Sequence, residues 1–324
     1  MARGRFSCFR FAGLLLAAPW LLASAAAAEP LAVVAAVKGR IEVTAAKGGP
    51  PVRASFGRSL ERGDRVAVPA GGAATIFFND GNVIELAERS TITIGGRAAP
   101  KSKGAAGPGL PGDVYASVTR FVAGGSRETG LVALSSLRAG PDAAPLLLEP
   151  RRTELLAASP AFRWRPVEGA ARYRVAVSGD AGELWNREVE GAALDYPADA
   201  PALAPGGDYL WEVRAFSDRG ELRREESSFH LLAAEEAAGV RASLTRISEV
   251  AGGAEGPAAR FLSGSYLFGR GLYRDAARQF EALSLLVPGS PAPHEALGNV
   301  YRAVGLMDLA AAEYQQALSL SREP

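Results

Sequence analysis

The spacing of apolar and polar residues changes several times along this chain, and the changes divide it into parts. Up to residue 97, short runs such as residues 66–68 and 91–94 alternate apolar and polar side chains. Alternation predicts β-strands, because successive side chains of a strand point to opposite faces of the sheet. Asp80-Gly81 lies between two apolar runs and predicts a hairpin turn, since glycine adopts positive φ without steric cost. We therefore expect a small all-β domain over residues 29–97.

Residues 98–144 have a different pattern. Glycine and proline are frequent in residues 98–112 and predict a linker. The apolar side chains of Val114, Val118, Phe121 and Val122 then recur at the spacing of one helix face. An apolar run at residues 131–137 predicts a strand. We expect a linker that contains one short helix and one strand.

Alternation of period two returns over residues 145–232. Tyr173, Val175 and Val177 alternate with polar neighbours, and Tyr209 and Trp211 do the same further on. Several such runs separated by turns predict a β-sandwich. After residue 232 the composition shifts to helix formers, and residues 233–256 predict a connecting helix followed by a turn.

An internal repeat with an offset of 34 residues begins at residue 257. The matched pairs are Gly264 and Gly298, Leu267 and Tyr301, Gly271 and Gly305, Ala276 and Ala310, Phe280 and Tyr314, and Leu283 and Ala317. Small residues at Gly264 and Ala276 allow two helices to approach closely, and Phe280 fills the space beside the next hairpin. Gly271 and Pro288 end helices. The pattern predicts two helical hairpins over residues 257–324.

The spacing Ala-x3-Phe, followed by proline eight residues later, resembles the tetratricopeptide repeat. The resemblance implies a groove lined by the first helix of each hairpin, which would bind an extended peptide or a partner helix. By position, the implied partner-binding residues are Phe261, Ser265, Phe268, Glu295, Asn299 and Arg302. Alternatively, these residues face solvent or pack on a neighbouring domain. About three repeats are needed for a stable array, so we expect the preceding helix to act as a cap, or the hairpins to dock on the sandwich or dimerise.

Two further resemblances concern the β-rich parts. Residues 60–66, 72–78 and 80–86 resemble the FecR domain, which implies an exported sensory or binding module. The segment before Phe11 is too short for the sigma-factor-binding domain of that family, so we do not expect direct anti-sigma activity. Residues 162–175 resemble a fibronectin type III domain.

The first 28 residues have the three parts of a secretory signal peptide. Arg3, Arg5 and Arg10 precede an apolar run that ends in four alanines. We expect cleavage near Ala28 and a periplasmic or extracellular protein, with an uncleaved membrane anchor as the alternative. The single cysteine, Cys8, lies in this segment, so the mature chain would lack disulfides and thiolate metal ligands.

Charge and motifs limit the remaining classes. Without the signal peptide the chain has 33 basic and 35 acidic residues, and this lack of excess positive charge disfavours a nucleic-acid partner. His230 and His294 lack a second ligand at metal spacing, and there is no nucleophile elbow, so neither a metal, a cofactor nor a catalytic residue is expected. Trp185 and Trp211 would stack on a sugar if they were exposed.

The sequence therefore predicts a multidomain α+β protein: a small all-β FecR-like domain, a fibronectin type III-like β-sandwich, and C-terminal α-helical hairpin repeats. Its predicted function is that of an exported, non-enzymatic binding or scaffold protein of the cell envelope. The partner would be a protein or peptide, with a glycan as a further possibility. Two other hypotheses are a FecR-type sensory or regulatory module and a protein that binds or hydrolyses envelope glycans.

Overall fold

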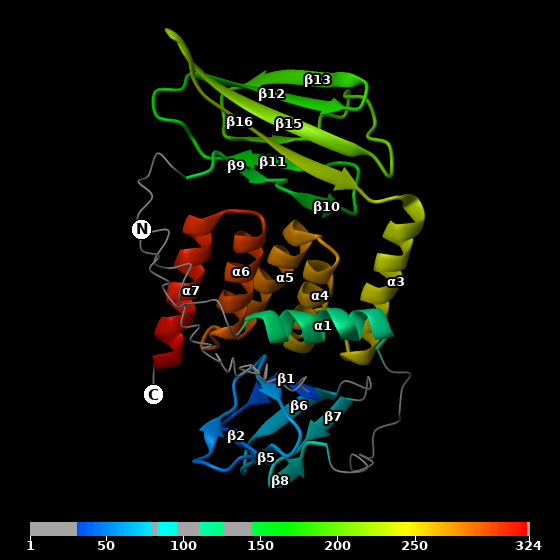
Figure 1. The fold of residues 1–324 in the computed structure, drawn as a ribbon, viewed down its shortest axis with the longest axis vertical. Coiled ribbons are helices and arrows are strands. Elements are labelled where there is room, and N and C mark those ends of the chain that lie inside the picture. The colour runs from blue at the N-terminus through cyan, green and yellow to red at the C-terminus, as the bar shows by residue number, and fades with distance from the viewer. Residues whose placement is uncertain (1–30, 79–82, 96–109, 126–143, 323–324) are drawn as a thin grey trace, which may run out of the picture.

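The protein has three layers (Figure 1), seen in a computed structural model that describes residues 31–78, 83–95, 110–125 and 144–322. A small β-domain lies at one end, helices form the middle layer, and a β-sandwich lies at the other end. The predicted signal peptide, the Asp80-Gly81 turn and the strand at 131–137 fall outside the described residues. The helical repeats, last in the sequence, thus lie between the two β-rich parts.

The small β-domain, called the roll below, consists of two four-stranded antiparallel sheets. One sheet has the order β4-β1-β6-β7 and the other β3-β2-β5-β8. The strands are β1 (Ala32–Lys38), β2 (Glu42–Thr44), β3 (Val52–Arg53), β4 (Ser59–Leu60), β5 (Arg65–Val68), β6 (Ala73–Phe78), β7 (Val83–Leu86) and β8 (Ser90–Thr93). Alternate side chains such as Val66 and Val68 fill the space between the sheets, as their spacing predicts.

A buried carboxylate fixes the turn that enters β5. Asp64 accepts hydrogen bonds from the backbone N–H groups of Ala46 (3.0 Å) and Glu61 (2.9 Å). Gly63 precedes it with φ +91°, and a Cβ there would lie 2.7 Å from Ala46. A glycine and an acceptor side chain are therefore both required at this turn.

The sandwich packs a five-stranded sheet on a three-stranded sheet, with the orders β10-β16-β15-β12-β13 and β14-β11-β9. The strands are β9 (Leu147–Glu149), β10 (Thr153–Leu155), β11 (Ala161–Trp164), β12 (Arg172–Gly179), β13 (Gly182–Val189), β14 (Ala193–Asp195), β15 (Asp208–Ser217) and β16 (Gly220–Leu231). Trp211 is buried in the core and its Nε1 donates to the Pro150 carbonyl at 2.6 Å. Trp211 therefore offers no exposed ring to a sugar, and Trp185 is half-buried against Phe162.

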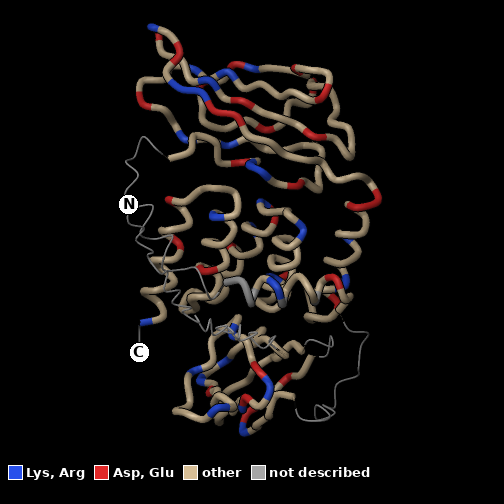
Figure 2. Tube along the Cα trace, in the orientation of Figure 1, with Lys and Arg blue, Asp and Glu red and all other residues tan. Residues whose placement is uncertain are grey.

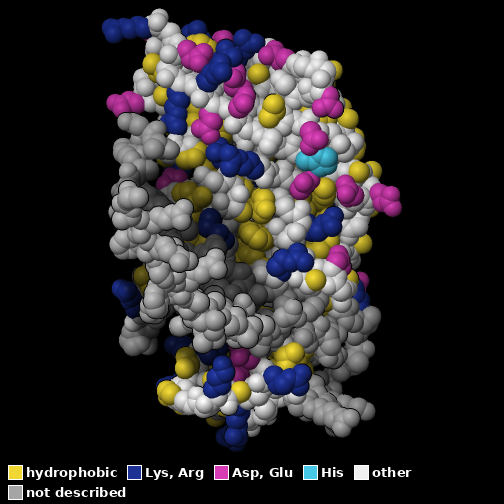
Figure 3. All heavy atoms as spheres, viewed as in Figure 1, with side chains coloured by type: hydrophobic (Ala, Val, Ile, Leu, Met, Phe, Trp, Pro, Cys, Tyr) yellow, Lys and Arg dark blue, Asp and Glu magenta, His cyan; other side chains and the backbone are white. Residues whose placement is uncertain are grey.

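The outer face of the larger sheet is polar. Charged residues of both signs alternate along its strands (Figure 2), and they pair along one strand, as in Arg214–Glu212 (2.6 Å), or between strands, as in Arg174–Glu183 (3.6 Å). Hydrophobic side chains instead gather over the helical layer on the face shown in Figure 3. The sandwich face is thus an ordinary solvated surface.

The middle layer contains six described helices. They are α1 (Gly112–Gly125), α3 (Ala234–Val250), α4 (Pro257–Gly269), α5 (Tyr273–Leu286), α6 (Ala292–Ala303) and α7 (Met307–Arg322). Helices α4 and α5 form one hairpin, α6 and α7 a second, and α3 packs beside α4. None of the helices in the described ranges is long and apolar enough to cross a membrane.

The two hairpins share the same close contact, 34 residues apart. A Cβ on Gly264 would lie 2.5 Å from the Phe280 ring, and a Cβ on Gly298 would lie 2.4 Å from the Tyr314 ring. Ala276 and Ala310 are both fully buried, and the inter-helix turns contain Gly271 (φ +75°) and Gly305 (φ +81°). Tyr301 is half-buried between the hairpins, and Pro288 follows the end of α5. The two hairpins therefore share the same side-chain contacts at the positions that the 34-residue repeat matches.

The sandwich touches both inter-helix turns. At the first turn, the Thr153 hydroxyl and the Glu154 N–H both donate to the Gly271 carbonyl at 3.0 Å. At the second turn, the buried Arg151 donates from Nε to the Val304 carbonyl at 2.9 Å and pairs with Glu225 of β16. The sandwich thus bonds to the turn of each hairpin, at carbonyl groups whose repeat positions differ by one residue.

Candidate functional site

Helix α1 lies across α4 on the side of the hairpins that faces the roll (Figure 1). Val114, Val118 and Phe121 are buried, which confirms three of the four residues that the sequence assigned to one helix face. The side chain of the fourth, Val122, is outside the description. Helix α1 precedes the sandwich in sequence but packs on helices that follow it.

Phe121 is the central contact between α1 and the hairpins. Its ring stacks on Phe280 (centroids 5.3 Å apart, 16° between planes) and meets Phe268 edge-on at 5.0 Å and Phe261 at 6.3 Å. A Cβ on Gly269 would lie 2.8 Å from the Ser117 Cβ, so the backbones of α1 and α4 approach closely there. Aromatic pairs of this geometry add about 0.5–1.5 kcal/mol each beyond the buried area.

The six predicted groove residues have different surroundings. Ser265 is fully buried, Phe261 is buried, and Phe268 is half-buried under α1. On α6, Glu295 is exposed, Asn299 is 7% exposed and Arg302 is half-buried. The structure brings Phe261, Glu295 and Asn299 together around one cavity and leaves Ser265, Phe268 and Arg302 outside it.

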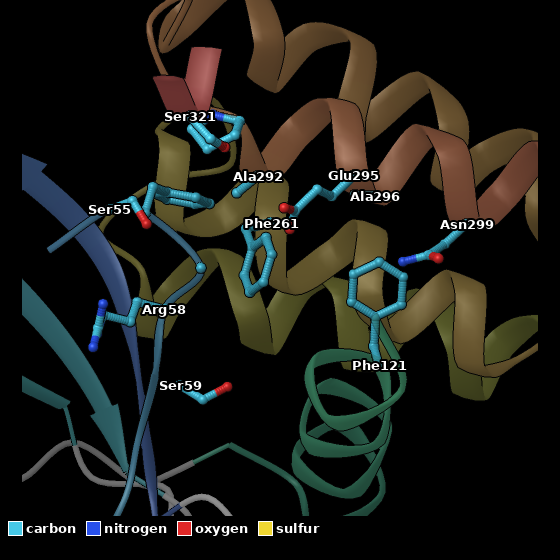
Figure 4. A pocket seen from close by; sticks show the side chains of 13 residues that line it. Ser55, Arg58, Ser59, Phe121, Phe261, Ala292, Glu295, Ala296, Asn299 and Ser321 are labelled. Carbon is cyan, nitrogen blue, oxygen red and sulfur yellow. The ribbon is translucent and has the colours of Figure 1, made fainter. Parts of the chain in front are cut away.

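This cavity, about 340 Å³ in volume, lies between the roll, α1 and the first helices of the two hairpins (Figure 4). It falls in the size range of small-ligand pockets, about 300–1,000 Å³. The residues that line it are Ser55, Phe56, Gly57, Arg58, Ser59, Phe121, Phe261, Pro291, Ala292, Glu295, Ala296, Asn299 and Ser321. A loop of the roll therefore forms one wall of the part of the predicted groove that α1 leaves uncovered.

The polar groups of the cavity come from both sides: Glu295 and Asn299 lie on α6, and Ser55, Arg58 and Ser59 belong to the roll. Among the described residues, the Glu295 carboxylate has no ion pair or hydrogen bond, and loss of hydration raises its pKa although the side chain remains open to solvent. Asn299 accepts a hydrogen bond from the Tyr314 hydroxyl at 2.8 Å, and its side chain points toward Phe121 (Figure 4). An acceptor carboxylate and an amide thus face two aromatic rings.

The roll contributes residues that sequence reasoning missed. Phe56 meets Phe261 edge-on at 5.0 Å, and a Cβ on Gly57 would lie 3.1 Å from Ala292. The signal for this contact was an aromatic residue next to a glycine in a turn, where an apolar ring has no reason to be unless it is covered. Phe121 was found as a core residue of α1 but not as part of the site.

Neither histidine joins a metal-binding group in the described part of the chain, where no cluster of three or more His, Cys, Asp or Glu could hold a metal ion. His230 pairs with Asp208 at 2.9 Å on the sandwich, and His294 pairs with Glu313 at 2.7 Å between α6 and α7. Both pairs lie on the surface or at its margin.

No protein-family model matches this chain, and no curated protein does so. Solved structures similar to it include fibronectin type III domains. FN3tt aligns over 26% of this chain and 83% of its own at 15% identity (TM-score 0.20). The fn3 domain of human collagen alpha-1(XX) aligns over 30% and 95% at 19% identity (TM-score 0.22), and two such domains of chicken tenascin over 60% and 83% at 11% identity (TM-score 0.21). Because these TM-scores are low, the sandwich assignment rests on the sheet topology described above.

Proposed function

We propose that this chain is an exported, non-enzymatic binding or scaffold protein of the cell envelope, in which two tetratricopeptide-like hairpins bind a protein or peptide partner. The FecR-like roll and the fibronectin type III-like sandwich hold the hairpins from opposite sides. The observation that supports this function best is the cavity at Glu295 and Asn299, which lies on the face of the hairpins that the repeat pattern assigns to partner binding.

The cavity has the composition of a peptide-binding site. Phe121 and Phe261 supply apolar surface, while the amide of Asn299 and the carboxylate of Glu295 supply hydrogen-bonding groups. Ligand sites combine an apolar lining with a few polar groups that fix orientation. Because Glu295 is without a cationic partner among the described residues, a peptide with a Lys or Arg side chain complements it.

Photo-crosslinking in cells tests this proposal. A photo-reactive amino acid replaces Glu295, which is exposed at the cavity, and, as a matched control, Glu221, which is exposed on the sandwich. We expect a crosslinked partner from position 295 and not from position 221. In a second strain, with the photo-reactive residue at Ser59 on the far wall of the cavity, Glu295→Lys should remove the same product, because it reverses the charge that a Lys or Arg of the partner complements.

Equal crosslinking from both positions, or a product that persists in the Glu295→Lys background, would contradict binding at this cavity. Turnover of an envelope glycan by the purified protein would support the hydrolase hypothesis instead. The sensory hypothesis makes a different prediction: a ligand of the roll would alter the labelling at Ser59 without itself contacting the hairpins.

A further inference from the structure

We propose that the face of the hairpins covered by α1 is a receptor for an amphipathic helix, and that α1 is the occupant which the chain itself supplies. The partner that fits is a helix with the α1 pattern: apolar residues at positions i, i+4 and i+7, the last one aromatic, and a small residue at i+3. This inference rests on the proposed function and extends it to an adjoining surface of the same hairpins: a helix that replaces α1 binds beside the cavity and brings its own aromatic residue to the position of Phe121.

The contact between α1 and the hairpins has the anatomy of a helix bound in a groove. Val114, Val118 and Phe121 are the anchors, and each is at least nine-tenths buried. Helix-in-groove recognition uses such anchors at i, i+3 or i+4, and i+7. The opposite face of α1, at Ala116 and Arg120, is exposed. One stripe of α1 therefore accounts for its described buried surface.

The receptor side is complementary to this stripe. Phe268 and Phe280 form two sides of the site for the Phe121 ring, with Phe261 at its margin. Gly269 permits the close approach of Ser117, which is why the i+3 position of the ligand must be small. These receptor residues belong to the first hairpin, and α1 also touches α6 of the second.

Helix α1 by itself is a weak helix. Its sequence, GDVYASVTRFVAGG, contains three β-branched valines, one threonine and three glycines in 14 residues. Such residues have low helix propensity, and isolated helices of about 14 residues are marginal in water. The groove therefore stabilises α1 rather than the reverse, which is the relation of a receptor to a peptide ligand.

Competition between helices tests the inference. A tethered helix has an effective concentration of about 1 mM, so it strongly suppresses the binding of a free one. In Val118→Asp/Phe121→Asp, the anchors of α1 are removed and the groove is vacated. Ala116→Asp/Arg120→Asp introduces the same two substitutions on the exposed face and leaves the groove filled. The probe is a fluorescent peptide with the sequence of residues 112–125.

We expect the probe to bind the vacated variant at least about ten-fold more tightly than the wild type or the exposed-face variant, because competition by α1 at about 1 mM has that effect when the helix dissociation constant is about 0.1 mM or lower. The same peptide with Phe121→Asp should lose that binding. Equal binding by all three proteins, no binding by a folded vacated variant, or equal affinity for both peptides would overturn the inference. A partner still crosslinked from position 295 would then leave the proposed function intact.

A measurement on the wild-type protein covers the case in which the vacated variant does not fold. If α1 is an exchangeable ligand, its amides should exchange with solvent at least about ten-fold faster than those of α4, by local opening. Exchange of α1 at the same rate as α4 would show that α1 is a permanent part of the core.

Discussion

The two glycines that let the hairpin helices approach make a quantitative prediction about stability. Gly298 is packed against Tyr314, whose ring is 4% exposed and is held by the hydrogen bond from its hydroxyl to Asn299. In Gly298→Ala the new Cβ would lie 2.4 Å from one ring carbon and 2.9 Å from another. Carbon atoms in contact prefer about 3.5–4.0 Å, so the ring or α6 must move by about 1 Å.

The size of the effect is the difference between two terms. Overpacking of this kind costs about 1–3 kcal/mol, and the upper part of that range applies because Tyr314 is anchored. Replacing glycine by alanine inside a helix stabilises the helix by about 1 kcal/mol. We expect Gly298→Ala to lower the free energy of unfolding by about 1–2 kcal/mol, or the midpoint of thermal unfolding by roughly 2–8 °C.

Gly239 in α3 is the matched control. It also lies inside a helix, but a Cβ there would meet nothing within 4 Å. Gly239→Ala should therefore raise the midpoint, by roughly 2–4 °C, because only the propensity term of about 1 kcal/mol remains. Thermal unfolding followed by circular dichroism at 222 nm compares the two. If Gly298→Ala stabilises the protein as much as Gly239→Ala does, the close contact with Tyr314 does not exist in solution.

Three further predictions concern single polar groups. Arg151→Ala leaves the Val304 carbonyl and the Glu225 carboxylate without their buried partner and should lower the free energy of unfolding by about 2–4 kcal/mol in urea titrations; Arg163→Ala, at an exposed pair, should change it by less than about 1 kcal/mol. Asp64→Ala removes the acceptor for two backbone N–H groups of the roll and should cost about 1.5–3 kcal/mol, measured in the same titration. Burial raises the pKa of Glu154 in the folded protein, so the neutral carboxyl group adds to the free energy of unfolding. This contribution is fully present at pH values below the ordinary pKa and is lost as pH rises through the raised pKa. Glu154→Gln should therefore flatten the decline in the unfolding midpoint that sets in as pH rises above the ordinary pKa of 4.5, and it should be stabilising at pH 7; an unchanged slope would show that the carboxylate is fully hydrated.

Local patterns carried enough information to predict the elements and the repeat. The offset of 34 residues paired Gly264 with Gly298 and Phe280 with Tyr314; the structure then shows that each glycine packs against the ring of its own hairpin, whereas the sequence placed Phe280 beside the next hairpin. The period of α1 identified its buried face. Each of these features depends on residues of one helix or of two consecutive hairpins.

The arrangement of the layers could not be predicted in the same way. The periodicity of α1 shows that one face is covered but does not identify what covers it. Phe56 and Phe261 are separated by 205 positions, and Arg151 and Val304 by 153, so no local period connects them. The groove assignment thus named Phe261, Ser265 and Phe268 by analogy with an open surface, whereas α1 and the roll lie over that part of the hairpins.

The hydrogen bonds of the sandwich to both inter-helix turns limit how the hairpins can move relative to each other. A stack of hairpins ordinarily bends at the joint between one hairpin and the next, where only side chains slide. Here the sandwich spans that joint, because Thr153 is hydrogen-bonded to Gly271 of the first hairpin and Arg151 to Val304 of the second. The angle between the hairpins is therefore fixed by their contacts with the sandwich, and a force applied to the sandwich acts on both hairpins together.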